Sequence, residues 1–246
     1  MTALPDQSRL VETAAKLVEA AKRAGADAAD AVAFRRIGLS VDIRNGAVEE
    51  TGRSEGDELA LRVFVGNRHA SVSTNGLSPA DELAIRAVAM AKVAPEDRFA
   101  GLAPADRLAK SFPELDLLDP SAPSVEDLID RATRAEQAAL AVPGIAKSGG
   151  TSAGWSLSGA VLVTSHGFTG AYMGSRHSVS ATVIAGEGTG MERDYDSASK
   201  IHASDLPDPA EIGRRAAERA VRRLNPTQMP TGSATVVYDP RVAVSL

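Results

Sequence analysis

The chain of 246 residues is long enough to bury a substantial core, in one large domain or two small ones. Its net charge of −5 and its 4% aromatic content disfavour non-specific attraction to phosphate backbones and base stacking on single strands. The absence of cysteine excludes disulfides, thiolate zinc sites and cysteine nucleophiles within the chain.

The first 75 residues predict a helix followed by strands. Apolar residues recur at helical spacing over residues 10–21, and Gly25 stands where that helix would end. From residue 31 to residue 75 the apolar period changes to two, which predicts two hairpins. Asn45-Gly46 and Gly66-Asn67 supply their turns, because asparagine and glycine adopt positive φ at low cost.

A second helix is predicted over residues 83–94. Ser78 offers an N-cap, Pro79 suits the first helical position, and Asp81 completes a capping-box pattern. No leader pattern or long apolar run occurs in the chain, so we expect a cytoplasmic protein without a membrane span.

The proline-rich residues 96–123 show little periodicity. Such a composition indicates an ordered surface excursion or a linker. We therefore consider residues 1–246 as one region with two sub-lobes, 1–95 and 124–246, joined by this connection.

The second half predicts a helix, a long β region and another helix. Ser124 with Asp127 repeats the capping pattern, and Pro143-Gly144 marks the end of the third helix. Residues 146–204 combine alternation with glycine-rich turns, which is typical of an antiparallel meander with one solvated face. Asp208-Pro209 begins the fourth helix.

The fourth helix has an apolar face and five arginines that we expect to face water: Arg214, Arg215, Arg219, Arg222 and Arg223. The last residues, 233–246, predict a strand and the start of a further element. The order of elements indicates an α+β fold, in which antiparallel or mixed sheets of hairpins and a meander pack with about four helices.

GEGTG at residues 186–190 is similar to part of a dinucleotide fingerprint, in which glycines let the backbone approach a pyrophosphate. No helix pattern follows, so no helix N-terminus is available to receive a phosphate. We interpret the stretch as a hairpin or bulge turn.

Four acidic residues beside this turn could be ligands of a hard cation: Glu187, Glu192, Asp194 and Asp196. Asp194 and Asp196 would share one strand face by period two. Because the spacing of an EF-hand is absent, a solvated acidic face is favoured, with a ligand or partner contact as the alternative.

The histidines do not form a zinc-protease pattern. His69, His166, His177 and His202 include no His-Glu-x-x-His arrangement and no i,i+4 pair, so structural roles are expected. GTSAG at 150–154 opens a strand instead of a strand-to-helix turn, which disfavours a serine nucleophile. The arginine face of the fourth helix has no interleaved aromatics, so a solvated face is favoured over a nucleic-acid contact.

Three stretches resemble the TldD/PmbA family, whose members are called modulators of DNA gyrase and include cytoplasmic metalloproteases. They are residues 41–92, beginning VDIRNGAVEETG, residues 177–199, beginning HSVSATVIAGEG, and residues 222–246, beginning RRLNPTQMPTG. The GMERDYD segment, and the lack of the zinc-binding His-Glu-x-x-x-His helix of the TldD branch, make the chain similar to the PmbA (TldE) branch. Family members continue after a segment like residues 236–246 into a C-terminal β-rich domain, so the resemblance implies that this chain is an N-terminal region.

The resemblance also implies a subunit that binds no metal itself and pairs with a TldD-like subunit to degrade or process peptides. No cofactor and no catalytic residue are expected in this chain, and zinc is expected in the partner. The alternative is a non-enzymatic binding or regulatory module. Direct contacts with nucleic acid or membrane are not expected, and a homodimer of the isolated chain stays open.

Peptide would be held by addition of a strand to a sheet, a mode suited to unfolded substrates. We hypothesise that the MERDYD strand and the hairpin of residues 62–68 contribute to the surface that contacts peptide or partner. The contact residues under this hypothesis are Arg62, Arg68, Met191, Arg193, Asp194 and Tyr195.

Overall fold

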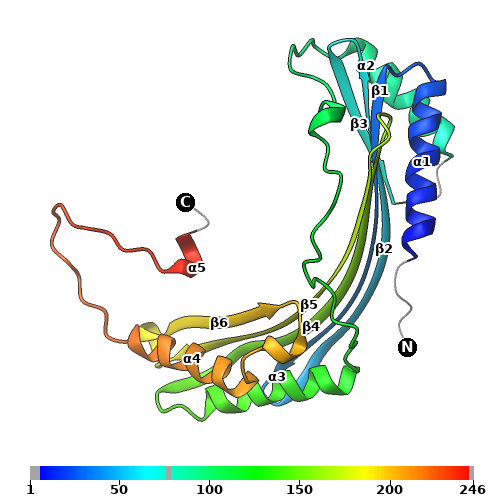
Figure 1. The fold of residues 1–246 in the computed structure, drawn as a ribbon. Coiled ribbons are helices and arrows are strands. Elements are labelled where there is room, and N and C mark those ends of the chain that lie inside the picture. Colours follow the sequence, from blue (N-terminus) through cyan, green and yellow to red (C-terminus); the bar gives the residue numbers. More distant parts are fainter. Residues whose placement is uncertain (1–5, 76–78, 244–246) are drawn as a thin grey trace.

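The computed structural model describes residues 6–75 and 79–243, and it confirms the α+β prediction. One curved sheet runs through the molecule, and its outer face is covered by helices (Figure 1). The elements are α1 (Gln7–Arg23), β1 (Ala28–Arg44), β2 (Ala47–Val65), β3 (Arg68–Thr74), α2 (Ala80–Val93), α3 (Val125–Leu140), β4 (Ile145–Thr164), β5 (Thr169–Ala185), β6 (Glu192–Lys200), α4 (Pro209–Arg222) and α5 (Pro240–Ala243), with short 3₁₀ turns at Ala105–Arg107, Gly188–Gly190 and Ala203–Asp205.

The sheet has the strand order β3-β2-β1-β4-β5-β6, and every neighbouring pair is antiparallel. The predicted hairpins and the predicted meander therefore join along β1 and β4 in one sheet. α1 and α3 each pack on both β1 and β4, whereas α2 packs on β2 and β3, and α4 packs on β5 and β6. The two halves of the chain thus repeat the order helix, three strands, helix, about an approximate two-fold axis between β1 and β4.

Both predicted hairpin turns are confirmed. Asn45 and Gly46 have φ of 53° and 75°, the positive values required by the two-residue turn between β1 and β2. Gly66, with φ of 56°, opens the turn between β2 and β3. The first turn is also held from a distance, because the buried carboxylate of Glu136 on α3 accepts hydrogen bonds from the N–H groups of Asn45 (2.9 Å) and Gly46 (2.7 Å).

The helix starts follow local capping chemistry. Ser124 and Asp127 form the predicted reciprocal capping box of α3, and the Asp208 side chain caps α4. The predicted cap at Ser78 lies outside the described residues, and Pro79 occupies the N-cap position of α2 instead of its first helical position. No helix in residues 6–75 and 79–243 is both long and apolar enough to cross a membrane.

Two apolar cores lie between the sheet and the outer helices. One core packs α1 and α2 on the sheet, with Leu17, Val18, Leu61 and Val63 among its buried members. The other packs α3 and α4, with Leu128, Val179 and Ile212. Many other positions in both cores are alanine, so the helices lie close to the strands. A small third cluster of Ile37, Trp155 and Leu157 lies on the two central strands, β1 and β4.

The connection between the halves is an ordered excursion. It crosses the inner face of the sheet on its way from α2 to α3 (Figure 1). The Asp97 N–H donates to the Asn67 carbonyl (2.7 Å) near its start. Near its end, the Ser175 N–H donates to the Leu117 carbonyl (2.9 Å), which adds this segment to the edge of β5 where β6 has ended.

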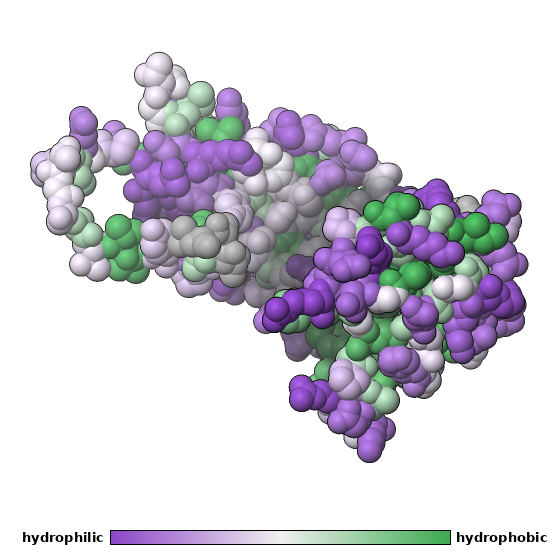
Figure 2. Space-filling model, turned by 90° about the horizontal axis from the view of Figure 1, so that it is seen from above, coloured by the Kyte–Doolittle hydropathy of each residue, from purple (hydrophilic) through white to green (hydrophobic). Residues whose placement is uncertain are grey.

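The strand predicted within residues 233–246 is not formed in the described part of that range. Residues 224–239 leave α4 without ladder pairing, and α5 follows on the inner side of the sheet (Figure 1). Viewed from above, this segment projects as an open loop that carries hydrophobic side chains (Figure 2); its exposed members are Met229, Val236, Val237 and Tyr238. The alternating pattern fails here because a strand needs a neighbour to complete its hydrogen bonds.

Candidate functional site on the inner face of the sheet

The inner face of the sheet is the side that points away from α1 to α4 (Figure 1). Odd-numbered residues of β1, β4 and β5 fill the cores beneath the helices. Because side chains alternate along a strand, the even-numbered residues of these strands point to the inner face. In the middle of the sheet they enclose a trough of about 360 Å³, lined by glycines and serines that include Gly38, Ser40, Gly52, Ser54, Gly154, Ser156 and Ser178.

Each glycine of the trough lies beside a serine of the neighbouring strand. A Cβ on Gly52 would lie 2.6 Å from the Ser40 hydroxyl oxygen, and one on Gly38 would lie 3.1 Å from that of Ser54. Larger side chains at these positions would crowd the inner side of the bend. The small residues therefore permit both the curvature of the sheet and an open surface on it. Sequence reasoning missed this trough, although its signal was present as glycine and serine at alternating positions.

Two arginines line the trough without a partner of their own. Arg36 projects from β1 and Arg176 from β5, both exposed, and neither forms an ion pair or side-chain hydrogen bond within the described residues. The other arginines of β1 and β2 all pair with carboxylates: Arg35 with Asp57, Arg44 with Glu49, Arg53 with Glu55 and Arg62 with Asp30. No aspartate or glutamate is among the described residues that line the trough.

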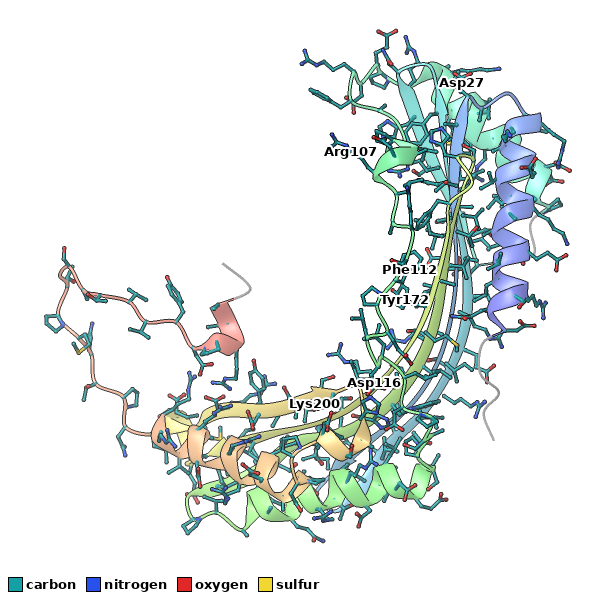
Figure 3. All side chains as sticks on the ribbon, in the orientation of Figure 1. Asp27, Arg107, Phe112, Asp116, Tyr172 and Lys200 are labelled. Atoms are coloured by element: carbon teal, nitrogen blue, oxygen red, sulfur yellow. The ribbon has the colours of Figure 1, made fainter. Side chains whose placement is uncertain are left out.

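An apolar groove of about 880 Å³ adjoins the trough along the strands. Its floor includes Val32 and Leu162, and one wall is formed by the excursion at Phe112. The rings of Phe112 and Phe168 meet edge to face, with centroids 6.0 Å apart. Figure 3 shows Phe112 and Tyr172 together on the inner side of the sheet, and both side chains are exposed.

The two predicted contact residues of the first half lie at one end of the sheet. Arg62 pairs with Asp30 across β1 and β2, and its guanidinium carbon lies 5.2 Å from the centroid of the Phe64 ring. Arg68 binds Glu96 (3.0 Å) and contacts the carbonyl of Ala94. Both arginines thus have partners within the chain.

The other four predicted contact residues lie at the opposite end. Met191, Arg193 and Tyr195 are exposed at the β5–β6 turn and on β6. The register of the sheet gives the separation of the two ends. The part of β6 around Tyr195 aligns, through β5 and β4, with a position on β1 about 13 residues from Asp30, the partner of Arg62. The two groups of predicted contact residues are therefore roughly 40 Å apart along the strands. The structure therefore does not bring the six residues into one cluster.

The prediction that Asp194 and Asp196 form a solvated face is wrong. They do share one face of β6, but it is buried against α4. The Asp196 side chain is 6% exposed and accepts a hydrogen bond from Arg215 Nε (2.8 Å) and another from Arg219. Two of the arginines of α4 predicted to face water, Arg215 and Arg219, thus neutralise a buried carboxylate. The pattern of the strand and the pattern of the helix, taken one at a time, do not reveal this pairing.

The Asp194 carboxylate is likewise bound by arginines, one just after α4 and one on α5. Arg223 Nη1, just after α4, lies 3.6 Å from its carboxylate, and Arg241 Nη1, on α5, lies 3.1 Å away. Burial raises the pKa of Asp194, but the hydrogen bond from the Tyr195 N–H and the Arg241 guanidinium outweigh burial and keep this pKa below its ordinary value. Arg241 also lies over the Tyr195 ring, 5.0 Å from its centroid, and so fastens α5 to β6.

His177 and Asp119 form a buried pair on the outer side of β5. His177 is fully buried, and its Nε2 lies 3.2 Å from Asp119 Oδ2, although neither ring nitrogen makes a well-directed hydrogen bond. Burial lowers the pKa of His177, and the Asp119 carboxylate only partly opposes this. Asp119 also accepts hydrogen bonds from the N–H groups of Ser121 (2.8 Å) and Ala203 (2.8 Å). The pair therefore fastens the end of the excursion to the sheet, which is a structural role.

The glycine-rich stretch and the acidic residues do not form an ion site. Gly186 and Gly188 have φ of 75° and 59° and build the turn between β5 and β6, as predicted. Within residues 6–75 and 79–243, no group of three or more histidine or acidic side chains converges in a way that could hold a metal ion. The four histidines therefore do not fit a zinc site in this part of the molecule.

Two family models match the chain. Residues 29–91 match the PmbA/TldA metallopeptidase domain 1, and residues 118–224 match the PmbA/TldA metallopeptidase central domain. Together the two matches cover more than half of the sequence.

Individual proteins are similar over nearly the whole chain. Metalloprotease PmbA of Escherichia coli O157:H7 is 34% identical over 98% of this chain and 54% of its own length. The Metalloprotease PmbA homolog of Haemophilus influenzae is 32% identical over 93% of this chain and 51% of its own. A solved structure from Bacteroides thetaiotaomicron, described as a modulator of DNA gyrase, superposes with a TM-score of 0.83 at 24% identity and covers 92% of this chain and 52% of that one. The chain spans about half the length of the curated relatives it matches.

Proposed function

Because the chain belongs to the PmbA/TldD metallopeptidase family, we propose that it acts as a PmbA/TldE-like subunit that holds peptides for cleavage by a zinc-binding TldD-like partner. Its own part in the reaction is to bind and orient an extended peptide on the inner face of the sheet. The bound zinc of the partner would supply the activated water. We place this activity in the cytoplasm.

The inner trough is the observation that carries this proposal. A surface of glycines and serines leaves room for a peptide backbone and offers hydroxyl groups to its N–H and C=O groups. A groove lined mainly by aromatic and aliphatic side chains, with Glu114 and Asp116 also on its wall, lies next to it for apolar residues. Such a face favours an unfolded chain over a folded protein, because it is concave and continuous along the strands.

The sheet also offers an edge for strand addition. β2 pairs with β1 from Ala47 to Phe64, but β3 covers only the part from Leu59 to Val65. The outer edge of residues 47–58 is therefore open among the described elements, and its side chains are mostly exposed. A peptide or a strand of the partner could complete the hydrogen bonds of this edge.

We propose the partner as the holder of the metal because the described residues lack a suitable set of ligands. Zinc in a hydrolytic site needs three protein ligands, usually with imidazole among them, and leaves one position for water. The described histidines and carboxylates do not converge in such a set. No step of the reaction is therefore assigned to a metal held by these residues.

A reconstitution experiment tests the proposal. The chain and a TldD-like protein are purified separately, mixed, and tested for a stable complex and for cleavage of an unfolded peptide. We expect cleavage by the mixture only, its loss with a chelator and its return with zinc. The variants Arg193→Ala and Tyr195→Ala, which alter exposed residues of β6, should weaken complex formation or cleavage. Full cleavage by the TldD-like protein alone, unchanged by this chain, would contradict the proposal.

A non-enzymatic regulatory module is the second candidate. It is favoured by the description of the similar Bacteroides structure as a modulator of DNA gyrase. In the same experiment, stable binding of an effector protein without any peptide cleavage in any mixture would support this candidate over the first.

A further inference from the structure

Two arginines in the trough, Arg36 and Arg176, have no structural role among the described contacts of the inner face. We propose that Arg36 and Arg176 form a carboxylate-binding subsite that anchors one end of an apolar peptide segment, whose side chains lie in the adjoining groove. This inference rests on the proposed peptide-holding function and specifies the chemistry of the peptide.

The register of the sheet places the two arginines around one space. Arg36 is aligned with Ser158 on β4, and Arg176 is aligned with Ser156 on the same strand. The strands of the two arginines, β1 and β5, are separated by β4, and their positions differ by two residues along the strands. Their Cα atoms are therefore about 12 Å apart. Since both side chains line the same trough, a carboxylate above Ser156, which also lines it, is within reach of both.

The charge of the trough matches a carboxylate. Guanidinium groups bind carboxylates through two parallel hydrogen bonds, and serine hydroxyls can donate to the remaining lone pairs. An arginine already paired with a carboxylate has little to offer such a ligand, and the paired arginines of β1 and β2 are in that state. Arg36 and Arg176 retain their full capacity, because no described carboxylate lines the trough.

The adjoining groove defines the rest of the ligand. Ala160 and Tyr172 are aligned on β4 and β5 and belong to the groove. The next inner row contains Ser158, directly beside Arg36, so groove and trough are about 7 Å apart along the strands. An extended peptide spans that distance with two residues. The face therefore fits apolar side chains followed closely by a carboxylate, supplied by a peptide C-terminus or by an acidic side chain.

Fluorescence anisotropy with three peptides tests the subsite. Each is a seven-residue peptide of alanine, leucine and phenylalanine with fluorescein at its N-terminus. One has a free C-terminal carboxylate, one is amidated, and one is amidated with glutamate as its last residue. We expect at least one carboxylate-bearing peptide to bind about tenfold more tightly than the neutral amide. If only the first peptide binds tightly, the subsite recognises a C-terminal carboxylate. If only the third binds tightly, it recognises an acidic side chain. If both bind tightly, the subsite accepts a carboxylate from either source.

A charge-matched pair of variants assigns the effect to the trough. The double variant Arg36→Gln/Arg176→Gln should lose about tenfold in affinity for the carboxylate peptides and less than twofold for the neutral amide. Arg9→Gln/Arg222→Gln removes the same charge from exposed helix positions and should change every affinity by less than twofold. Circular dichroism of both variants should match that of the wild type, because all four side chains are exposed.

The outcomes separate this inference from the proposed function. Equal binding of all three peptides, or equal losses in the two double variants, would overturn the carboxylate subsite and leave peptide holding intact. No detectable binding of any peptide to the wild-type chain would overturn both.

Discussion

Asp196 illustrates how single residues acquire their roles in this molecule. In isolation it is one acidic residue of an alternating strand, yet its carboxylate is buried under two guanidinium groups of α4. Glu136 is likewise buried on a helix, where its carboxylate receives the N–H groups of a hairpin turn. In contrast, Arg36 and Arg176 line the trough without an ion-pair partner among residues 6–75 and 79–243. Buried charges need partners, whereas exposed unpaired charges on a concave surface are free for ligands.

Replacing Asp196 by alanine should reduce the free energy of unfolding by about 2 kcal/mol, as measured by urea denaturation. The substitution removes the acceptor of Arg215 and Arg219, which are about one-third exposed and can turn partly to water. Glu187→Ala removes the same charge at an exposed position of the nearby turn and should change the value by less than about 0.5 kcal/mol. Equal effects of the two variants would show that the buried pair contributes nothing.

Stability should fall as the pH drops below about 6.5, the ordinary pKa of histidine. Burial lowers the pKa of His177, so the unfolded chain takes up a proton at a higher pH than the folded chain does. Urea denaturation at pH 7.5, 6.5 and 5.5 measures this slope, which His177→Gln should flatten. The hydrogen bond to the Asp116 carbonyl raises the pKa of His202, so His202→Gln should make the fall steeper. Parallel slopes in all three proteins would contradict the assignment.

At the scale of elements, one glycine determines how closely α3 and α4 pack. α3 and α4 lie side by side on the outer face, and Gly213 is at their closest approach. A Cβ at this position would lie 1.9 Å from the Ala135 carbonyl oxygen. The alanines that line both helices have the same effect on a smaller scale. α4 can therefore pack on α3 while its Arg215 and Arg219 bind the Asp196 carboxylate of β6.

Gly213→Ala should destabilise the protein by about 2–3 kcal/mol, because α3 and α4 must separate to admit the methyl group. Helix propensity alone predicts the opposite, a gain of about 1 kcal/mol. Thermal and urea unfolding decide between them. Gly56→Ala, at a strand position with no atom within 4 Å of the new methyl group, serves as the control and should have little effect. A stabilising Gly213→Ala would refute the close approach.

At the scale of the whole molecule, two cores share one sheet. β1 and β4 each pass from the core of α1 and α2 to the core of α3 and α4, and Trp155 lies in the small cluster on these strands. Neither half can complete its sheet alone, because β1 needs β4 as its neighbour. The same sheet is curved, so that its inner face is concave (Figure 1).

Leu17→Ala and Leu128→Ala should each cost about 2–5 kcal/mol, since both side chains are buried in different cores. The shared strands predict that either variant shifts the whole unfolding transition. Trp155 fluorescence and far-ultraviolet circular dichroism should therefore give coincident curves in both variants. Two separated transitions, one for each core, would contradict this coupling.

The sequence by itself determined the features that depend on near neighbours. The Asn45-Gly46 turn, the Ser124–Asp127 capping box and the apolar face of α1 all follow from residues a few positions apart. The family resemblance likewise depends on continuous stretches, and the family models match those of the two lobes, residues 29–91 and 118–224. The α+β class follows from the order of such local patterns.

Only the tertiary structure decided how these pieces meet. The pairing of β1 with β4, the burial of Asp196 by Arg215 and the support of the Asn45-Gly46 turn by Glu136 join residues far apart in the chain. The same is true of the trough, whose walls come from four strands of both halves. Local periodicity says which face of a strand is apolar, but not which helix packs on that face or which charged groups the helix brings to it. That choice depends on long-range packing and on the curvature that small inner residues permit.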